Sequence, residues 1–266
     1  MEPLAINSER VSKKLEAFIR QEFSEAGFDR AVVALSGGVD SSTTAYLAQR
    51  ALGAENVWGV NMPYRTSSPQ SASDAQLVAH ELGINFLTIE ITDMIDAYFE
   101  RYPDADRLRR GNKMARERMT ILYDQSSALQ ALVLGSGNKT ELLLGYCTLH
   151  GDTACALAPL GDLYKTQVRE LARFLGVPEH IIQKVPTADL WPGQSDEAEL
   201  GFTYEEVDKL LYFMIEKRYS FAELRELEFK EAFIQQVTDR IKRSRYKRCP
   251  PSIPRMNQGL IEGNSP

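Results

Sequence analysis

The sequence predicts an α/β protein, a doubly wound parallel sheet flanked by helices in a single domain. Short apolar runs typical of buried strands alternate with longer helix-like stretches, the order that a parallel sheet with crossover helices requires. Loops of small residues follow two of the apolar runs directly. No Pro-, Gly- or Ser-rich linker divides the 266 residues convincingly into two parts.

The first predicted elements are a helix, a strand and a second helix. Residues 8–27 carry apolar side chains at helical spacing and close with Gly27, a residue that commonly ends helices. Residues 31–35, Ala-Val-Val-Ala-Leu, are an unbroken apolar run and predict a buried strand. A helix-like pattern follows over residues 43–52, after a Gly-rich loop.

Two further strands and two helices follow in alternation. Residues 56–61 predict the second strand, and residues 73–82 predict a helix that a glycine stops. Residues 85–89 predict the third strand. A helix is predicted over residues 91–102 because its pattern stops near Pro103.

The second half of the chain adds a long helix and a fourth strand. The helix is predicted over residues 112–130, the strand over residues 131–134, and a later helix over residues 166–174. Residues 186–199 are rich in Pro, Gly and acids and predict a mobile loop. The tail, residues 250–266, is expected to be irregular.

Strands that alternate with helices indicate a parallel sheet with right-handed crossovers. In such sheets, ligands bind beyond the carboxyl ends of the strands. The loops after the first, second and fourth strands are therefore expected to share one cleft.

Composition and charge exclude several classes of protein. The net charge of −6 gives no electrostatic basis for general nucleic-acid binding. No apolar run reaches membrane-spanning length, and the first 20 residues lack a signal-peptide core, so no membrane partner is expected. Cys147, Cys155 and Cys249 form no CxxC pair, so neither disulfides nor zinc are expected and a cytoplasmic location fits.

The loop after the first strand reads Ser36-Gly37-Gly38-Val39-Asp40-Ser41-Ser42. A helix start with glycines and hydroxyls in front of it suits phosphate, because its N–H groups are unpaired and its dipole is positive there. A carboxylate at Asp40 makes sense in such a loop if a divalent cation bridges it to the phosphate. The string differs from the Walker A pattern, and a plain strand-to-helix turn is the alternative.

This loop resembles the pyrophosphate-binding loop of the ATP pyrophosphatase superfamily, whose fold is Rossmann-like. With four more motifs, in the right order, the chain resembles the ammonia-dependent NAD synthetase family from about residue 30 to residue 251. The other motifs are residues 111–116 (Gly-Asn-Lys-Met-Ala-Arg), 135–141 (Gly-Ser-Gly-Asn-Lys-Thr-Glu), 159–168 (Pro-Leu-Gly-Asp-Leu-Tyr-Lys-Thr-Gln-Val) and 190–197 (Leu-Trp-Pro-Gly-Gln-Ser-Asp-Glu).

The resemblance implies a ligase that converts deamido-NAD (nicotinic acid adenine dinucleotide) to NAD. ATP and Mg²⁺ would activate the carboxylate as an acyl-adenylate, with pyrophosphate leaving. Ammonia would then displace AMP. The enzyme would have to hold two polyanions together and neutralise charge on the departing pyrophosphate.

The resemblance also implies roles for individual residues. Asp40 and Glu141 would bind Mg²⁺, although a first-turn acid on a helix is an alternative for Glu141. Lys165 would stabilise charge in the transition state, and Asp152 would orient or deprotonate ammonium. The ATP contacts that it implies are Ser36, Gly37, Gly38, Asp40, Ser41, Ser42, Met62, Arg65, Ser136, Lys165 and Thr187.

The implied substrate site departs from the family pattern. Arg116 matches an arginine that binds the dinucleotide, and Lys247 lies in a C-terminal segment that reaches the substrate phosphates in the family. However, Leu149 stands where the family has a substrate-binding lysine, and Ala156 where it has an aspartate. Either a variant arrangement recognises nicotinate, or the acid substrate differs.

The sequence leaves three functions open. The first is the NAD synthetase, a homodimer that uses free ammonia and has residues 112–130 as its candidate interface. Free ammonia is expected because too few residues precede the first strand for an amidase domain. The second is another adenylating amide-forming or thiolating ATP pyrophosphatase. The third is an ATP-binding regulatory protein without turnover.

Overall fold

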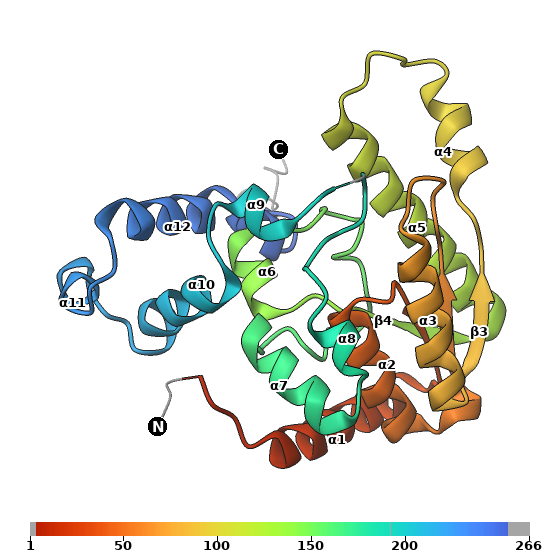
Figure 1. Ribbon diagram of the computed structural model, residues 1–266. Helices are drawn as coiled ribbons and strands as arrows, with labels where there is room; N and C mark the ends of the chain where they lie inside the picture. The colour runs from red at the N-terminus through yellow and green to blue at the C-terminus, as the bar shows by residue number, and fades with distance from the viewer. Residues whose placement is uncertain (1–3, 192, 255–266) are drawn as a thin grey trace, which may run out of the picture.

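The computed structural model describes residues 4–191 and 193–254, and it shows a parallel sheet covered by helices on both faces (Figure 1). Each predicted strand is confirmed to within one residue at either end. The strands are β1 (Arg30–Ala34), β2 (Val57–Asn61), β3 (Asn85–Thr88) and β4 (Ala131–Leu134).

The strands lie in the order β3-β2-β1-β4. The chain builds the sheet outward from β1 through β2 to β3, and then returns to place β4 on the other side of β1. The order therefore reverses between β1 and β4, and a ligand cleft is expected beyond the carboxyl ends of these two strands.

Twelve α-helices lie in the described part of the chain. They are α1 (Ser8–Ala26), α2 (Val39–Leu52), α3 (Pro69–Leu82), α4 (Thr92–Phe99), α5 (Arg107–Leu129), α6 (Lys139–Leu144), α7 (Lys165–Leu175), α8 (Glu179–Ile182), α9 (Asp196–Leu200), α10 (Tyr204–Leu211), α11 (Phe221–Glu226) and α12 (Glu231–Arg243). Short helical turns add η1 (Ala54–Asn56), η2 (Tyr212–Glu216) and η3 (Arg245–Arg248).

The two faces of the sheet carry separate apolar cores, as the doubly wound prediction requires. Ala31 and Val33 of β1 pack with α1, α2, α3, α7 and α8 on one face. Val32, whose side chain points to the opposite face, packs with α4 and α5. Both cores consist of buried aliphatic and aromatic side chains.

A third apolar core lies beside the sheet rather than on it. It joins α6 to α9, α10, α11 and α12, and it includes Tyr204, Leu210, Ile234 and Val237. Helices α10, α11 and α12 form the blue-green and blue lobe at the left of Figure 1, next to the green α6. The elements beyond residue 200 have no counterpart among the predicted ones.

Several predicted boundaries need correction. The helix predicted from residue 43 begins at Val39, so Asp40 lies in its first turn. The long helix begins at Arg107 because the Asp106 carboxylate accepts a hydrogen bond from the Arg109 N–H (2.7 Å) and caps it. The predicted loop over residues 186–199 is interrupted by α9, which begins at Asp196.

The predicted irregular tail is confirmed only as far as residue 254, and residues 255–266 lie outside the described part. No helix within that part is both long enough and apolar enough to cross a membrane.

Candidate active site

The loop between β1 and α2 forms one wall of the candidate site. Gly38 is the N-cap of α2 in an extended conformation, so the helix starts immediately after the two glycines. The Ser41 hydroxyl donates to the Gly38 carbonyl (3.1 Å) and accepts from the Ser36 N–H (3.2 Å). These bonds fold the loop around the N-terminus of α2, which provides positive potential for an anion.

Gly37 shows why the loop needs glycine. Its φ is +74°, and a Cβ atom built on it would lie 2.2 Å from the carbonyl oxygen of Ser71 on α3. Any larger residue would both strain the backbone and displace α3. Gly37 therefore packs the loop against α3 and faces away from the cleft.

The loop between β4 and α6 forms the opposite wall. The Asn138 side chain caps α6, and Glu141 completes a capping box with it. The Asn138 amide also donates to Asp40 Oδ1 (2.9 Å). One side chain therefore joins the two loops across the point at which the strand order reverses.

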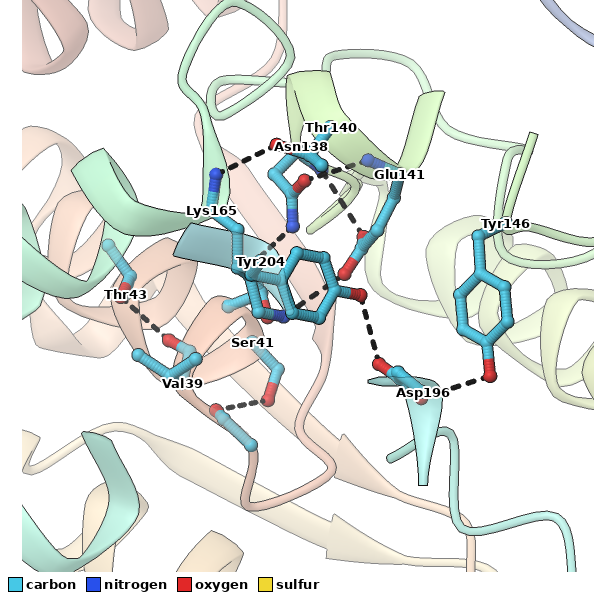
Figure 2. Close-up of polar contacts among 12 residues, drawn as sticks. Val39, Ser41, Thr43, Asn138, Thr140, Glu141, Tyr146, Lys165, Asp196 and Tyr204 are labelled. Carbon is cyan, nitrogen blue, oxygen red and sulfur yellow. Dashed lines mark hydrogen bonds and ion pairs between the residues drawn. The ribbon is translucent and has the colours of Figure 1, made fainter. Parts of the chain in front are cut away.

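Lys165, the first residue of α7, lies between the two walls. Its Nζ is 2.5 Å from Asp40 Oδ2 and 3.1 Å from Glu141 Oε1. The ammonium is almost fully buried, and two carboxylates share it (Figure 2).

The ionisable groups of this centre are strongly perturbed. Burial raises the pKa of Glu141 to about 7, although the charge of Lys165 opposes this shift. Burial alone would lower the pKa of Lys165, but the charges of Asp40 and Glu141 outweigh it and raise that pKa above its usual value. Perturbed groups of this kind are frequent at catalytic sites.

A second group of polar side chains surrounds Lys165 from the side of the third core. The Tyr204 hydroxyl donates to Asp196 Oδ2 (3.1 Å), and its ring lies 5.1 Å from Lys165 Nζ. Tyr146 donates to the other oxygen of Asp196 (3.1 Å). Figure 2 shows Tyr204 and Tyr146 directed at this carboxylate from opposite sides.

A cleft of about 760 Å³ opens in front of the centre, between the two loops, α5 and residues 181–199. Most of the predicted site residues line it. They are Ser36, Gly38, Asp40, Ser41, Met62, Arg116, Ser136, Glu141, Asp152, Lys165, Thr187 and Lys247.

Three predicted ATP contacts do not line the cleft. Gly37 faces α3, and the Ser42 hydroxyl is buried inside α2 without a partner among the described residues. The Arg65 guanidinium forms an ion pair with Asp96 (2.7 Å) instead of entering the cleft.

The predicted substrate contacts Arg116 and Lys247, and the predicted ammonium residue Asp152, each form hydrogen bonds with the backbone of residues 145–149. Arg116 Nε donates to the Leu149 carbonyl (3.2 Å). Asp152 accepts from the Thr148 N–H (2.6 Å), and burial raises the pKa of its carboxyl. Lys247 Nζ donates to the carbonyls of Gly145 and Cys147 at the end of α6 (2.7 and 2.6 Å), which leaves one of its three N–H groups for a ligand.

The sequence reasoning missed two features of this cleft. Arg118 Nε donates to the Met62 carbonyl (3.0 Å), and the rest of its guanidinium lines the cleft without a hydrogen bond to a described residue. Burial lowers the pKa of Arg118 to about 10. The roles of Asn138 and Asp196 were also missed. Both lie inside the motifs at residues 135–141 and 190–197, and their hydrogen-bonding side chains could have indicated a role in the site.

The comparisons with known proteins point to one family. The sequence profile of the NAD synthase family matches residues 11–251. A protein of Trichlorobacter lovleyi named NH(3)-dependent NAD(+) synthetase is 51% identical over 98% of this chain and 96% of its own length.

Two solved structures share the fold. The NH3-dependent NAD synthetase of Campylobacter jejuni, in complex with a nitrate ion, has a TM-score of 0.80 at 30% identity and covers 94% of this chain and 100% of its own. The NMN synthetase of Francisella tularensis has a TM-score of 0.85 at 30% identity and covers 95% of this chain and 100% of its own.

Proposed function

Because this chain belongs to the NAD synthase family, we propose that its cleft amidates deamido-NAD to NAD with ATP and ammonia. The enzyme is a ligase that forms a C–N bond. The single observation that carries the assignment of the site is the Lys165 ammonium, which joins Asp40 and Glu141 across two strand-end loops.

The first half of the reaction forms the acyl-adenylate. A carboxylate oxygen of the substrate attacks the α-phosphorus of ATP. The bond between that phosphorus and the oxygen that bridges the α- and β-phosphates breaks, and pyrophosphate leaves. We propose that the N–H groups at the start of α2, with Ser36 and Ser41, hold the β- and γ-phosphates, because a helix N-terminus favours anions. Lys165 supplies positive charge where negative charge builds up in the transition state.

Asp40 and Glu141 are the proposed Mg²⁺ ligands. Their oxygens converge on one Nζ atom, so they are close enough to share a cation, and carboxylate oxygens are ligands that Mg²⁺ prefers. Mg²⁺ bound there would offset the charge of the phosphates.

The second half of the reaction forms the amide. Ammonia attacks the carbonyl carbon of the adenylate, and the bond to the AMP oxygen breaks. Because ammonium has no lone pair, a nearby carboxylate must first accept one of its protons. Asp152 lines the cleft, is buried, and is our proposal for this group, together with a role in orienting the ammonium.

Arg116 and Lys247 are proposed to contact the phosphates of the dinucleotide, because both are cations that line the cleft. Met62, Ser136 and Thr187 are proposed ATP contacts on the same ground. Leu149 supplies no charge where the family has a lysine. The similarity to an NMN synthetase makes the corresponding mononucleotide acid the competing substrate to test.

Among the described residues, Cys147 is the cysteine that lines the cleft, and it does not suit the thiolating alternative. Burial raises the pKa of Cys147 to about 11 and also raises that of Cys155, whereas a nucleophilic cysteine needs a lowered value. The regulatory alternative needs no charge-stabilising lysine between two carboxylates. The assay below distinguishes the thiolating and the regulatory alternatives from the proposed function.

We further propose a homodimer in which α4 and α5 form the interface. Met94, Tyr98 and Tyr102 follow one another at a four-residue spacing and are each more than two-fifths exposed. Free thiols at all three cysteines suit the cytoplasm as the proposed location. We treat the chain as one domain, because Tyr204 of the third core reaches the same site as Lys165.

The function is tested by incubating the protein with ATP, Mg²⁺ and ammonium, and by adding deamido-NAD, its mononucleotide acid, or other carboxylic acids. We expect NAD, AMP and pyrophosphate in equal amounts with deamido-NAD. Turnover with only another acid would favour another adenylating amide-forming or thiolating ATP pyrophosphatase. ATP binding without turnover would favour an ATP-binding regulatory protein.

A further inference from the structure

Helix α10 presents two polar side chains to the reaction centre from a part of the chain that the five motifs do not include. Tyr204 and Asp208 lie four residues apart, on the same face of the helix, and both are fully buried. Tyr204 touches the centre through Asp196 and its ring. Asp208 does not line the cleft, so its burial needs another explanation.

The Asp208 carboxylate joins the first turns of α6 and α7. Its Oδ1 accepts from the Thr140 hydroxyl (2.5 Å), and its Oδ2 accepts from the Thr166 N–H (2.8 Å). Thr140 Oγ in turn accepts from the Lys165 N–H (3.0 Å). Thr140 precedes Glu141, and Thr166 follows Lys165.

Burying a carboxylate costs free energy of folding, so we expect the position of Asp208 to serve the function of the site. A buried carboxylate loses its hydration, and no described basic side chain forms an ion pair with Asp208. Two hydrogen bonds and the positive N-terminal end of α7 offset the lost hydration of the Asp208 carboxylate. These donors belong to the two turns that carry Lys165 and Glu141.

We propose that Asp208 is a positioning residue, which locks the starts of α6 and α7 together so that Lys165 Nζ meets Asp40 and Glu141. The proposal rests on the function proposed above for Lys165. Asp208 touches no substrate, and it acts through Thr140 and the backbone of Thr166. Displacing a catalytic group by about 1 Å lowers rates on the order of a hundredfold, which sets the size of the effect.

The experiment uses the full chain with Asp208→Asn, Thr140→Val and the double variant. Asparagine keeps the shape of the side chain but removes the charge, and valine keeps the shape of threonine but removes the hydroxyl. We would measure kcat, the KM for ATP and for deamido-NAD, the melting temperature, and the Kd of ATP by calorimetry in EDTA.

The proposal predicts that each single variant lowers kcat at least about tenfold, at a temperature where the protein is folded. The KM for deamido-NAD should stay within about twofold of the wild type, because that substrate lies on the other side of the cleft. The double variant should be no slower than the slower single variant, because both changes break one chain of contacts. The Kd of ATP should rise about fivefold, as a charged phosphate contact weakens.

Tyr46→Phe is the matched control. The Tyr46 hydroxyl donates to Glu81 (3.0 Å) and to the Gly176 carbonyl (3.2 Å), so it joins other elements to the opposite end of α7. Its loss should lower the melting temperature and leave kcat unchanged. If this variant slows the enzyme as much as Asp208→Asn does, α7 needs only general stability and the proposal is wrong.

Unchanged kcat in both single variants, with a lower melting temperature, would also overturn the proposal. If Asp208→Asn does not fold, Thr140→Val decides the question alone. If the wild type binds ATP but makes no NAD, the proposed function has failed, and the Kd of ATP still tests whether Asp208 positions Lys165.

Discussion

Lys165 is the residue at which the two walls of the cleft meet. Asp40 comes from the first turn of α2, Glu141 from the first turn of α6, and the ammonium of Lys165 from the first turn of α7. Three helix starts point to one place, so positive helix ends surround a site that must receive a polyanion. The two carboxylates prevent an excess of positive charge before the nucleotide arrives.

The first prediction concerns this lysine. Lys165→Gln should lower kcat by about a hundredfold or more, because it removes charge stabilisation from the departing pyrophosphate. The matched control is Lys139→Gln. Lys139 Nζ also contacts two carboxylates, Asp162 (2.8 Å) and Glu216 (2.5 Å), but outside the cleft.

Steady-state kinetics would be compared at equal folded fractions, as judged by circular dichroism. An equal loss of kcat in both variants would mean that the loss of any lysine–carboxylate ion pair, rather than the place of Lys165 in the cleft, explains the effect.

The second prediction concerns Cys147 and pH. Because burial raises its pKa to about 11, on the order of one molecule in a thousand carries the thiolate at pH 8. Alkylation by iodoacetamide should therefore be slow at pH 8 and should accelerate roughly tenfold per pH unit until about pH 11. Mass spectrometry would follow it beside the exposed Cys249.

In urea both thiols should react at similar rates. Equal rates in the native protein at pH 8 would contradict the burial of Cys147 and would reopen the thiolating alternative.

Individual residues differ in how well the sequence could place them. Asp40, Glu141 and Lys165 were predicted because each lies in a motif that resembles one of the NAD synthetase family. Asp208 was not, because a lone aspartate in an amphipathic helix is normally a surface charge, and only the fold brings Thr140 and Thr166 to it. Arg65 lies next to a predicted strand end, but its partner Asp96 comes from a distant helix.

Helix α2 and its loop depend on the difference between two neighbouring glycines. Gly37 has a positive φ and lies against the backbone of α3. Gly38 has φ −94°, and a Cβ atom on it would meet nothing closer than Ser36 Oγ at 3.5 Å. The two glycines therefore serve different purposes.

The third prediction follows from this difference. Gly37→Ala should destabilise the fold by about 2 kcal/mol or more, because the left-handed backbone costs about 1–2 kcal/mol and the contact with Ser71 adds to it. Gly38→Ala should leave the free energy of unfolding nearly unchanged and should raise only the KM for ATP. Urea unfolding and ATP kinetics would separate the two, and equal stability losses would contradict the packing of Gly37 on α3.

At this level the strands were easier to predict than the helices. Strands β1, β2 and β4 are short, mostly buried apolar runs, and the shorter β3 carries apolar Phe86 and Leu87 between polar ends. Helices α6, α9 and α11 have at most six residues each, so their periodicity is too short to recognise. All three pack in the third core, and α6 and α11 also have side-chain caps at their N-termini.

The whole molecule places its cleft where the strand order reverses, and it adds a lobe that the sheet alone does not need. The lobe brings Tyr204 and Asp208 behind Lys165. The opposite side of the cleft is closed by α5, with α4 exposed next to it (Figure 1). The sequence predicted the sheet and the position of the cleft, but the lobe depends on contacts between distant segments.

The fourth prediction concerns assembly. If α4 forms part of a homodimer interface, Met94→Lys should shift the protein toward monomer in sedimentation velocity, because a charge would enter an apolar contact. Phe18→Lys on α1 is the control, with similar exposure at a different surface. A sedimentation coefficient that is unchanged by Met94→Lys, or shifted equally by both variants, would contradict the proposed interface.

The adenylate itself can be followed with deamido-NAD whose nicotinate carboxylate carries ¹⁸O. Attack by that carboxylate on the α-phosphorus at the Lys165 centre must leave one ¹⁸O atom on the phosphate of AMP after ammonia displaces it. We expect mass spectrometry to find this atom in AMP, with no ¹⁸O in pyrophosphate. Label that appears in inorganic phosphate, or AMP that stays unlabelled while NAD is made, would show that the cleft does not activate its substrate by cleaving ATP between the α- and β-phosphates.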